Sequence, residues 1–240
     1  MIRPVRRLSL SSGPRWSAEV RFTDAFDGDF AVDAPRDALD SRRSAVAPVP
    51  WTWLRQVHGG RVVSVGHPGE HAGESADGLV TDRAGVVLAV QTADCAPVAF
   101  VADNGIVGAA HAGWRGLVEG VLEATVGALR TLGATGLHAY LGPCIQPGCY
   151  EFGTEDLERV AASLGNQVRA TTSAGRPALD LVGAVRTSLA TCQVPLDTSL
   201  AACTACSDEL FSYRAGGDHS RQSLAIWLDD QHRGSTGGPT

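Results

Sequence analysis

Short apolar blocks alternate with polar residues along this chain, and their spacing switches between strand-like and helical several times. Apolar or β-branched runs predict strands at Arg61–Val65, Val86–Val90, Pro97–Val101, Ile106–Ala110, Leu137–Leu141 and Leu224–Leu228. Segments with apolar residues three or four positions apart predict helices at Leu117–Leu132, Glu155–Leu164 and Leu179–Ala190. Gly133 follows the first helix at the position expected of a C-terminal cap.

The first 50 residues have weaker periodicity, with many charges and several prolines. They predict a short antiparallel sheet edge, then a loop or a poor helix around Arg36–Val46. Some strands follow one another directly and others alternate with helices. This order favours an α+β fold, a single-domain sandwich of mixed β-sheets flanked by helices, over a doubly wound parallel sheet. We expect one domain over residues 1–232 and a disordered tail over residues 233–240.

Composition narrows the class of protein. Of the 240 residues, 44% are apolar and 19% charged, as in ordinary globular proteins. The net charge of −6 argues against general nucleic-acid binding, which relies on Lys and Arg. No apolar run reaches the roughly 18 residues of a membrane span, and no apolar segment follows the basic N-terminus. We therefore expect a cytoplasmic protein without a membrane partner, whose six cysteines are thiols or ligands rather than disulfides.

Three residues carry side chains that bind metals. Cys95 follows a predicted strand, His58 lies in a glycine-bounded turn, and His111 precedes a predicted helix. Two imidazoles and a thiolate suit zinc or copper, and three protein ligands leave a fourth position open, as in catalytic zinc sites. Each residue alone fits a structural role equally well, and their wide separation in the sequence does not establish that they meet.

The segment that begins at His111, HAGWRG, has a second possible use. Gly113 and Gly116 permit close backbone approach, and the start of a helix attracts anions through its free N–H groups. Arg115 could bind two phosphate oxygens at once. The alternative is a tight turn that carries a surface arginine.

Seven segments in order resemble the YfiH family, also called the laccase-domain, polyphenol oxidase or peptidoglycan-editing-factor family. They are LRQVHGGRVV, ADGLV, AVQTADCAPV, AAHAGWRG, LGPCIQPGCYEFG, CTACSDELFSYR and SLAIWL, which together span the chain from Trp51 to Leu228. The chain departs from the family pattern before His58, where a glycine-rich turn and an Asn-Leu segment are missing. It also lacks the glycine that usually precedes the arginine matching Arg221.

The resemblance implies a metal centre of His58, Cys95 and His111, with zinc as the cofactor. It implies phosphorolysis of purine nucleosides (adenosine, inosine and methylthioadenosine) with adenosine deamination as a side activity, in a monomer or homodimer. The partners would then be a purine nucleoside and phosphate, with Arg221 as a further phosphate-binding candidate beside Arg115. The older laccase name implies copper and the oxidation of phenols instead.

Two aspartates are candidates for proton transfer or for orienting the ligands. Asp94 precedes Cys95 directly, and Asp77 ends the loop Gly66–Asp77. A metal-bound histidine usually donates its other N–H to such an acceptor. A turn or capping role suits both aspartates equally well.

Two other kinds of protein remain open. A metal-free thiol hydrolase acting in peptidoglycan editing would use Cys95 as nucleophile and His58 or His111 as base. A structural zinc protein would close a tetrahedral site with the pairs Cys144/Cys149 and Cys203/Cys206. Metal content discriminates the first alternative from the metal enzyme.

Overall fold

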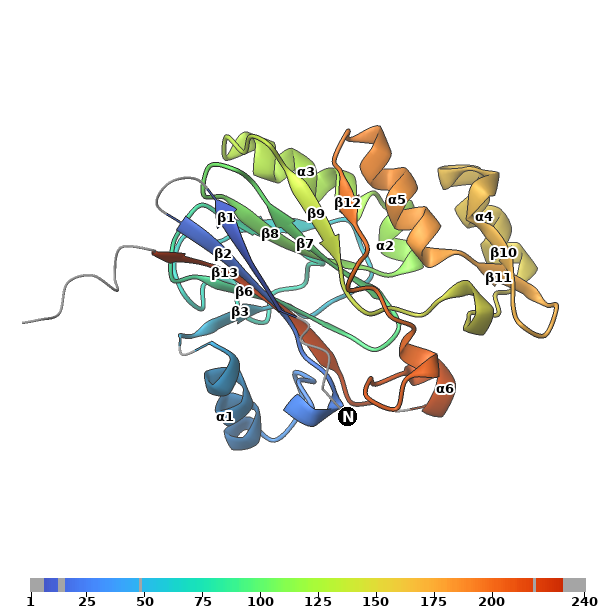
Figure 1. The fold of residues 1–240 in the computed structure, drawn as a ribbon, viewed down its shortest axis with the longest axis horizontal. Helices are drawn as coiled ribbons and strands as arrows, with labels where there is room; N and C mark the ends of the chain where they lie inside the picture. Colours follow the sequence, from blue (N-terminus) through green and yellow to red (C-terminus); the bar gives the residue numbers. More distant parts are fainter. Residues whose placement is uncertain (1–6, 13–15, 48, 218, 231–240) are drawn as a thin grey trace, which may run out of the picture.

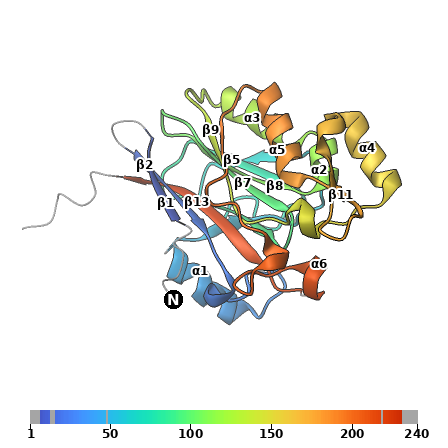
Figure 2. The ribbon, with the colours of Figure 1, turned by 45° about the vertical axis from the view of Figure 1, so that its right-hand side comes forward.

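The computed structural model describes residues 7–12, 16–47, 49–217 and 219–230. The expected tail over residues 233–240 lies outside these residues. Two β-sheets pack face to face with helices on both outer sides, as Figures 1 and 2 show from two directions. This is the mixed-sheet architecture expected from the order of elements. None of the helices in the described segments is long and apolar enough to cross a membrane.

The two main sheets have five and six strands, and a separate antiparallel pair of strands lies outside them. In spatial order, the five-stranded sheet contains β1 (Arg7–Ser12), β2 (Trp16–Phe22), β13 (Gln222–Asp230), β6 (Val87–Thr92) and β3 (Trp51–Trp53). The six-stranded sheet contains β12 (Leu196–Asp197), β9 (His138–Leu141), β7 (Ala96–Val101), β8 (Val107–Ala112), β5 (Gly78–Thr81) and β4 (Val62–Ser64). Most neighbours are antiparallel, whereas β3–β6, β4–β5 and β9–β12 are parallel.

Alternation along the strands divides the interior into layers. On β7, Ala99 and Val101 face the other sheet, whereas Val98 and Phe100 face the helices. The helical layer over the six-stranded sheet contains α2 (Trp114–Val118), α3 (Val121–Thr131), α4 (Thr154–Leu164) and α5 (Leu181–Thr191). The opposite face of the five-stranded sheet is covered by α1 (Arg36–Val46), which buries Leu39 against Trp51.

Most predicted elements are present with ends shifted by one or two residues. The antiparallel edge is the pair β1–β2, and the poor helix is α1. The predicted helix Leu117–Leu132 was wrong as one element, because Gly120 interrupts it with a φ of 77° and divides it into α2 and α3. Five short strands without a clear pattern were not predicted: β3, β5, β10 (Arg169–Thr171), β11 (Pro177–Leu179) and β12.

Candidate metal centre

The turn that carries Cys95 connects the two sheets. Residues 93–95 join β6 of the five-stranded sheet to β7 of the six-stranded sheet. Asp94 has a φ of 95° in this turn, a conformation that aspartate tolerates better than most residues. Cys95 therefore lies at the end of the sandwich, held by two rigid strands.

The Asp94 carboxylate fixes this turn to a distant part of the chain. It accepts hydrogen bonds from the hydroxyls of Thr204 at 2.6 Å and Ser212 at 2.7 Å. The backbone N–H of Arg214 donates to its other oxygen at 2.7 Å. These three bonds make Asp94 a positioning residue for Cys95, and its transfer of protons stays a prediction.

Asp77 aligns both histidines. Its carboxylate accepts from the His111 Nδ1–H at 2.8 Å and from the His58 backbone N–H at 2.9 Å. The N–H groups of Val57 and Gly59 donate to its second oxygen. Since Nδ1 of His111 is occupied, Nε2 is the ring atom available as a ligand. The buried Asp77 carboxylate thus fixes both the backbone conformation of the loop that carries His58 and the tautomer of His111.

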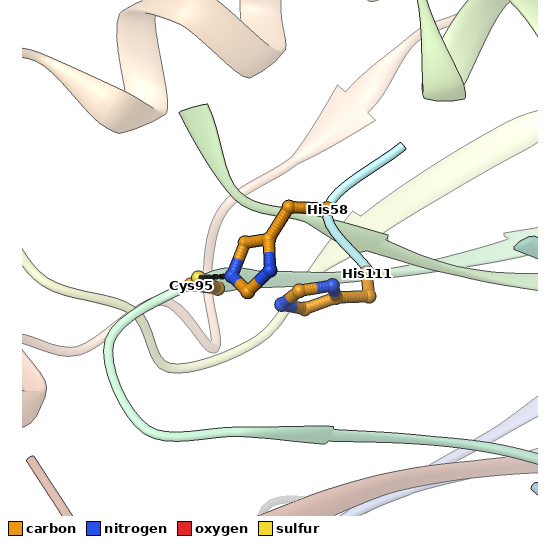
Figure 3. Close-up of side chains that lie close together, drawn as sticks. All are labelled: His58, Cys95 and His111. Carbon is orange, nitrogen blue, oxygen red and sulfur yellow. Dashed lines mark hydrogen bonds between the residues drawn. The ribbon is translucent and has the colours of Figure 1, made fainter. Parts of the chain in front are cut away.

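The three predicted ligands converge. The donor atoms of His58, Cys95 and His111 all lie within 4.8 Å of one another, and Figure 3 shows the three side chains meeting. The Cys95 Sγ lies 3.7 Å from the His58 Nε2, and the two rings stand edge to face with centroids 4.7 Å apart. His111 is 3% exposed, while the other two are partly accessible.

This donor set fits a tetrahedral ion. Zinc–nitrogen bonds of about 2.0–2.1 Å and zinc–sulfur bonds of about 2.3 Å separate two ligands by about 3.4–3.6 Å. The 3.7 Å between Cys95 and His58 is close to that separation. A thiolate with two imidazoles also suits copper, so the residues fit either metal.

The electrostatics of the site favour an ionised thiol. Burial opposes this ionisation, but the adjacent His111 and His58 outweigh burial and lower the pKa of Cys95 to about 6. Burial likewise opposes a charge on His111, while Cys95 and Asp77 raise the pKa of its imidazole to about 9. The metal-free site is therefore a thiolate–imidazolium pair over the neutral range.

Gly113 is required by close packing rather than by a turn. A Cβ at this position would lie 2.7 Å from the His58 Cδ2 and 3.0 Å from the Cys95 Sγ. Gly113 also caps α2, and its carbonyl accepts from the Leu117 N–H. A Cβ on Gly116 would lie 3.4 Å from the Gly59 carbonyl oxygen. Both glycines allow the loop of His58 to pack against the start of α2.

Two arginines pack on aromatic side chains, and both act electrostatically on Tyr150. The Arg115 guanidinium lies 4.4 Å from the Trp114 ring centroid, and the Arg214 guanidinium lies 4.9 Å from that of Tyr150. Burial and the nearby Cys95 raise the pKa of Tyr150, whereas Arg214 and Arg115 oppose this rise. The prediction included Arg115, but Tyr150 and Arg214 were not identified, although both lie in the quoted motifs GCYEFG and ELFSYR.

Arg221 directly precedes β13. Its backbone N–H donates to Asp29 at 2.9 Å, and its Nη1 donates to the Ser220 carbonyl at 2.8 Å. Phosphate binding by Arg221 stays a prediction.

The four remaining motif cysteines do not form one group. The sulfur atoms of Cys149, Cys203 and Cys206 all lie within 4.8 Å of one another. Cys144 is fully buried, and its Sγ accepts from the side chain of Gln146. Cys144 lies outside the group of converging sulfur atoms, and burial raises the pKa of its thiol. The four-cysteine site is therefore corrected to a group of three.

Fold and site together define a class: a mixed-sheet sandwich with a His/Cys/His centre at the end of its sheets. Residues 5–229 match the family model described as multi-copper polyphenol oxidoreductase laccase. The chain belongs to this family, in agreement with the resemblance seen in its motifs.

Relatives in the family carry the name purine nucleoside phosphorylase. The Streptomyces griseus protein "Purine nucleoside phosphorylase ORF3" is 39% identical over 209 residues, which cover 85% of this chain and 84% of that protein. "Purine nucleoside phosphorylase YfiH" of Escherichia coli is 37% identical over 204 residues, covering 82% and 83% respectively. The crystal structure of Neisseria meningitidis protein NMB0706 superposes with a TM-score of 0.78 at 27% identity, covering 93% of this chain and 99% of that one.

Proposed function

We propose that this protein is a zinc-dependent purine nucleoside phosphorylase that acts on adenosine, inosine and methylthioadenosine. The observation that carries the proposal is the convergence of His58, Cys95 and His111 in a chain whose relatives bear that name. Its partners are a purine nucleoside and phosphate. Its six cysteines, all unpaired, suit a reducing cytoplasm.

Phosphorolysis places a phosphate oxygen next to C1′ of the ribose. The new C1′–oxygen bond forms as the bond from C1′ to the purine nitrogen breaks. The electron pair leaves with the purine, which takes up a proton. The products are the free base and ribose 1-phosphate, or 5-methylthioribose 1-phosphate when the substrate is methylthioadenosine. The protein has to hold the anion, orient the sugar and stabilise the leaving base.

The residues around the centre supply these roles. Arg115 and Arg214 provide positive charge near Tyr150, which itself interacts electrostatically with Cys95, and guanidinium groups bind phosphate through two oxygens. Gly113 and Gly116 let the loop of His58 pack closely against the start of α2. Bound zinc would supply Lewis-acid polarisation of a substrate atom. Adenosine deamination, in which water replaces the amino group and ammonia leaves, is proposed as the side activity of the same site.

The first experiment compares Cys95→Ser with Cys192→Ser. Nucleoside turnover should disappear in the Cys95 variant, because a hydroxyl is a far poorer zinc ligand than a thiolate. The Cys192 variant should match the parent protein, since Cys192 lies at the end of α5, outside both ligand groups. Base release is followed with and without phosphate, together with metal content. Copper with phenol oxidation, or activity without metal, would replace the proposal by the laccase or the thiol-hydrolase alternative.

The second experiment tests the phosphate site through Arg115→Ala. Arg159 is the matched control, because its guanidinium also packs on Trp114, at 5.6 Å from the ring centroid. Loss of one charged hydrogen-bonding group should raise KM for phosphate by roughly tenfold or more and leave deamination almost unchanged. Equal losses in both reactions, or equal effects in Arg159→Ala, would make Arg115 a packing residue only.

A further inference from the structure

A second group of metal-binding side chains lies outside the His/Cys/His centre. It consists of Cys149, at the end of the short helix Pro147–Cys149, with Cys203 and Cys206 from the segment 203–206. Their sulfur atoms lie within 4.8 Å of one another although the two segments are far apart in the sequence. Three thiols brought together by separate segments form a polydentate site rather than an isolated cysteine.

The Cys149–Cys206 sulfur separation lies between that of a disulfide and that of two thiolates on one zinc ion. The Cys149 and Cys206 sulfurs are 3.0 Å apart, whereas a disulfide bond measures about 2.03–2.05 Å. Two thiolates on one zinc ion lie about 3.8 Å apart, given zinc–sulfur bonds of about 2.3 Å. The observed separation is within about 1 Å of either arrangement, so the proposal rests on the grouping of three thiols rather than on this distance.

The backbone around the group is arranged for a thiolate. The Gln146 N–H donates to the Cys203 Sγ at 3.5 Å, and such bonds favour the charged sulfur. Residues 203–206, which have the C-x2-C spacing, form a tight 3-10 turn. The Cys206 N–H donates a hydrogen bond to the Cys203 carbonyl at 3.3 Å and closes this turn. Short C-x2-C turns of this kind supply two ligands to one ion in zinc sites. Cys206 is exposed, so a fourth ligand can arrive from solvent.

We propose that Cys149, Cys203 and Cys206 form a second metal site, which binds a thiophilic divalent cation of the zinc class with a water or another small ligand in the fourth position. This site is independent of the nucleoside reaction. It lies next to the Asp94 anchor, because Thr204 stands between two of its ligands and donates to the Asp94 carboxylate at 2.6 Å. A cation here would fix the segment that holds the turn of Cys95.

The test measures zinc per chain in protein purified without oxygen and then equilibrated with zinc. Cys95→Ser removes a ligand of the first centre, so this variant should keep one zinc ion. Adding Cys149→Ser and Cys206→Ser should lower the content to none, whereas adding Cys192→Ser should leave it at one. A Cys95→Ser protein that holds no zinc would overturn the proposal, and so would a Cys149–Cys206 disulfide found by mass under these conditions.

A second measurement needs no change within the group. In Cys95→Ser, zinc should slow alkylation of Cys149, Cys203 and Cys206 at least tenfold, with Cys192 unaffected. Cadmium added to the same protein should produce sulfur-to-metal charge-transfer absorption. Equal alkylation with and without zinc would contradict the proposal. Because both readouts use protein without a complete first centre, failure here leaves the proposed phosphorylase activity untouched.

Discussion

Asp77 is the residue on which the geometry of the centre depends. It is fully buried, yet four donors surround its two oxygens: one histidine ring and three consecutive backbone N–H groups. Burial opposes its charge, but the His111 hydrogen bond and these N–H groups outweigh burial and lower the pKa of the carboxyl. The Asp77 carboxylate therefore takes the place of water as the hydrogen-bond acceptor for the backbone N–H groups of residues 57–59.

Replacing Asp77 by asparagine should weaken zinc binding by about 10–100-fold, the range found when partners of metal-bound histidines are lost. An amide offers one acceptor oxygen in place of two, so the loop of His58 or the ring of His111 loses its partner. Zinc affinity is measured by competition with a chromophoric chelator. Asp82→Asn is the control, since Asp82 is exposed and contacts Arg83. Unchanged affinity in the Asp77 variant would contradict its orienting role.

The metal-free protein should contain a reactive thiolate at Cys95. Its pKa is lowered from 9.0 to about 6, so its alkylation rate should rise through a midpoint near 6. Cys95 and His111 affect stability with opposite signs: the contribution of Cys95 is lost as pH falls through about 6, and the contribution of His111 is lost as pH rises through about 9. His111→Gln should move the midpoint upward. A midpoint near 9 in the parent protein would contradict the thiolate–imidazolium pair.

The residue chemistry of the centre was predictable, but its assembly was not. Ligand type indicated zinc or copper, and the seven motifs indicated which residues would meet. The separation of Cys95 and His58 along the sequence does not predict that they are neighbours. The turn at 93–95 connects two sheets, and each sheet pairs strands that are far apart in the sequence. Asp94 illustrates the limit: its position suggested proton transfer, whereas its partners lie more than a hundred residues later in the chain.

At the scale of elements, the centre lies where three connections meet. The loop of His58, the β6–β7 turn and the β8–α2 junction pack so closely that side-chain volume is excluded at Gly113. Gln56 strengthens this contact, because its side-chain amide donates to the Gln91 carbonyl at 2.7 Å and accepts from the Gln91 N–H at 2.7 Å. The Gln56 side chain thus pairs with the backbone of β6 through two hydrogen bonds, as the backbone of a neighbouring strand would.

Gly113→Ala should abolish or strongly reduce metal binding while the protein stays folded. The added methyl group would meet His58 and Cys95 inside contact distance, so the imidazole has to move away from the sulfur. Metal per chain and the unfolding midpoint are measured together. Gly127→Ala is the matched control: it lies within α3 with open space around it, and alanine there should stabilise the fold by roughly 0.5–1 kcal/mol. Normal metal content in Gly113→Ala would refute the steric role.

Element prediction succeeded where periodicity was long enough to measure. The 11-residue helix α4 carries a clear amphipathic repeat and was predicted within a residue of its ends. The 11-residue helix α1 buries only Leu39, and its weak periodicity predicted a loop or a poor helix over the same residues. The strands β3 and β5 have three and four residues and almost no exposed positions, so no alternation marks them. The division of α2 from α3 depends on a single glycine conformation, which apolar spacing does not report.

At the scale of the whole molecule, two apolar layers share the six-stranded sheet. One layer fills the space between the sheets, and the other lies beneath the helices α2 to α5. Both layers end near the metal centre, because β7 and β8 carry core residues on both faces and lead to Cys95 and His111. The centre is thus supported from two sides by close-packed interior.

Phe100→Ala should lower the free energy of unfolding by about 3–5 kcal/mol, since Phe100 is fully buried in the helical layer and its removal leaves a cavity. Urea denaturation measures the change. Val32→Ala serves as the control: Val32 is 40% exposed, and its truncation should change stability by no more than about 0.5 kcal/mol. A loss below about 1 kcal/mol for Phe100 would mean that the layer collapses around the gap.

The position of β13 has a consequence for synthesis on the ribosome. This strand, residues 222–230, pairs with β2 on one side and with β6 on the other. Before residues 222–230 have been synthesised, β2 of the hairpin β1–β2 lacks its second neighbouring strand. The edge of β6 that pairs with β13 likewise has no partner strand. Completion of the five-stranded sheet therefore waits until residues 222–230 have been synthesised, although folding in many chains proceeds from the N-terminus. Nascent chains arrested before Gln222 should stay sensitive to protease, and chains released after Asp230 should become resistant.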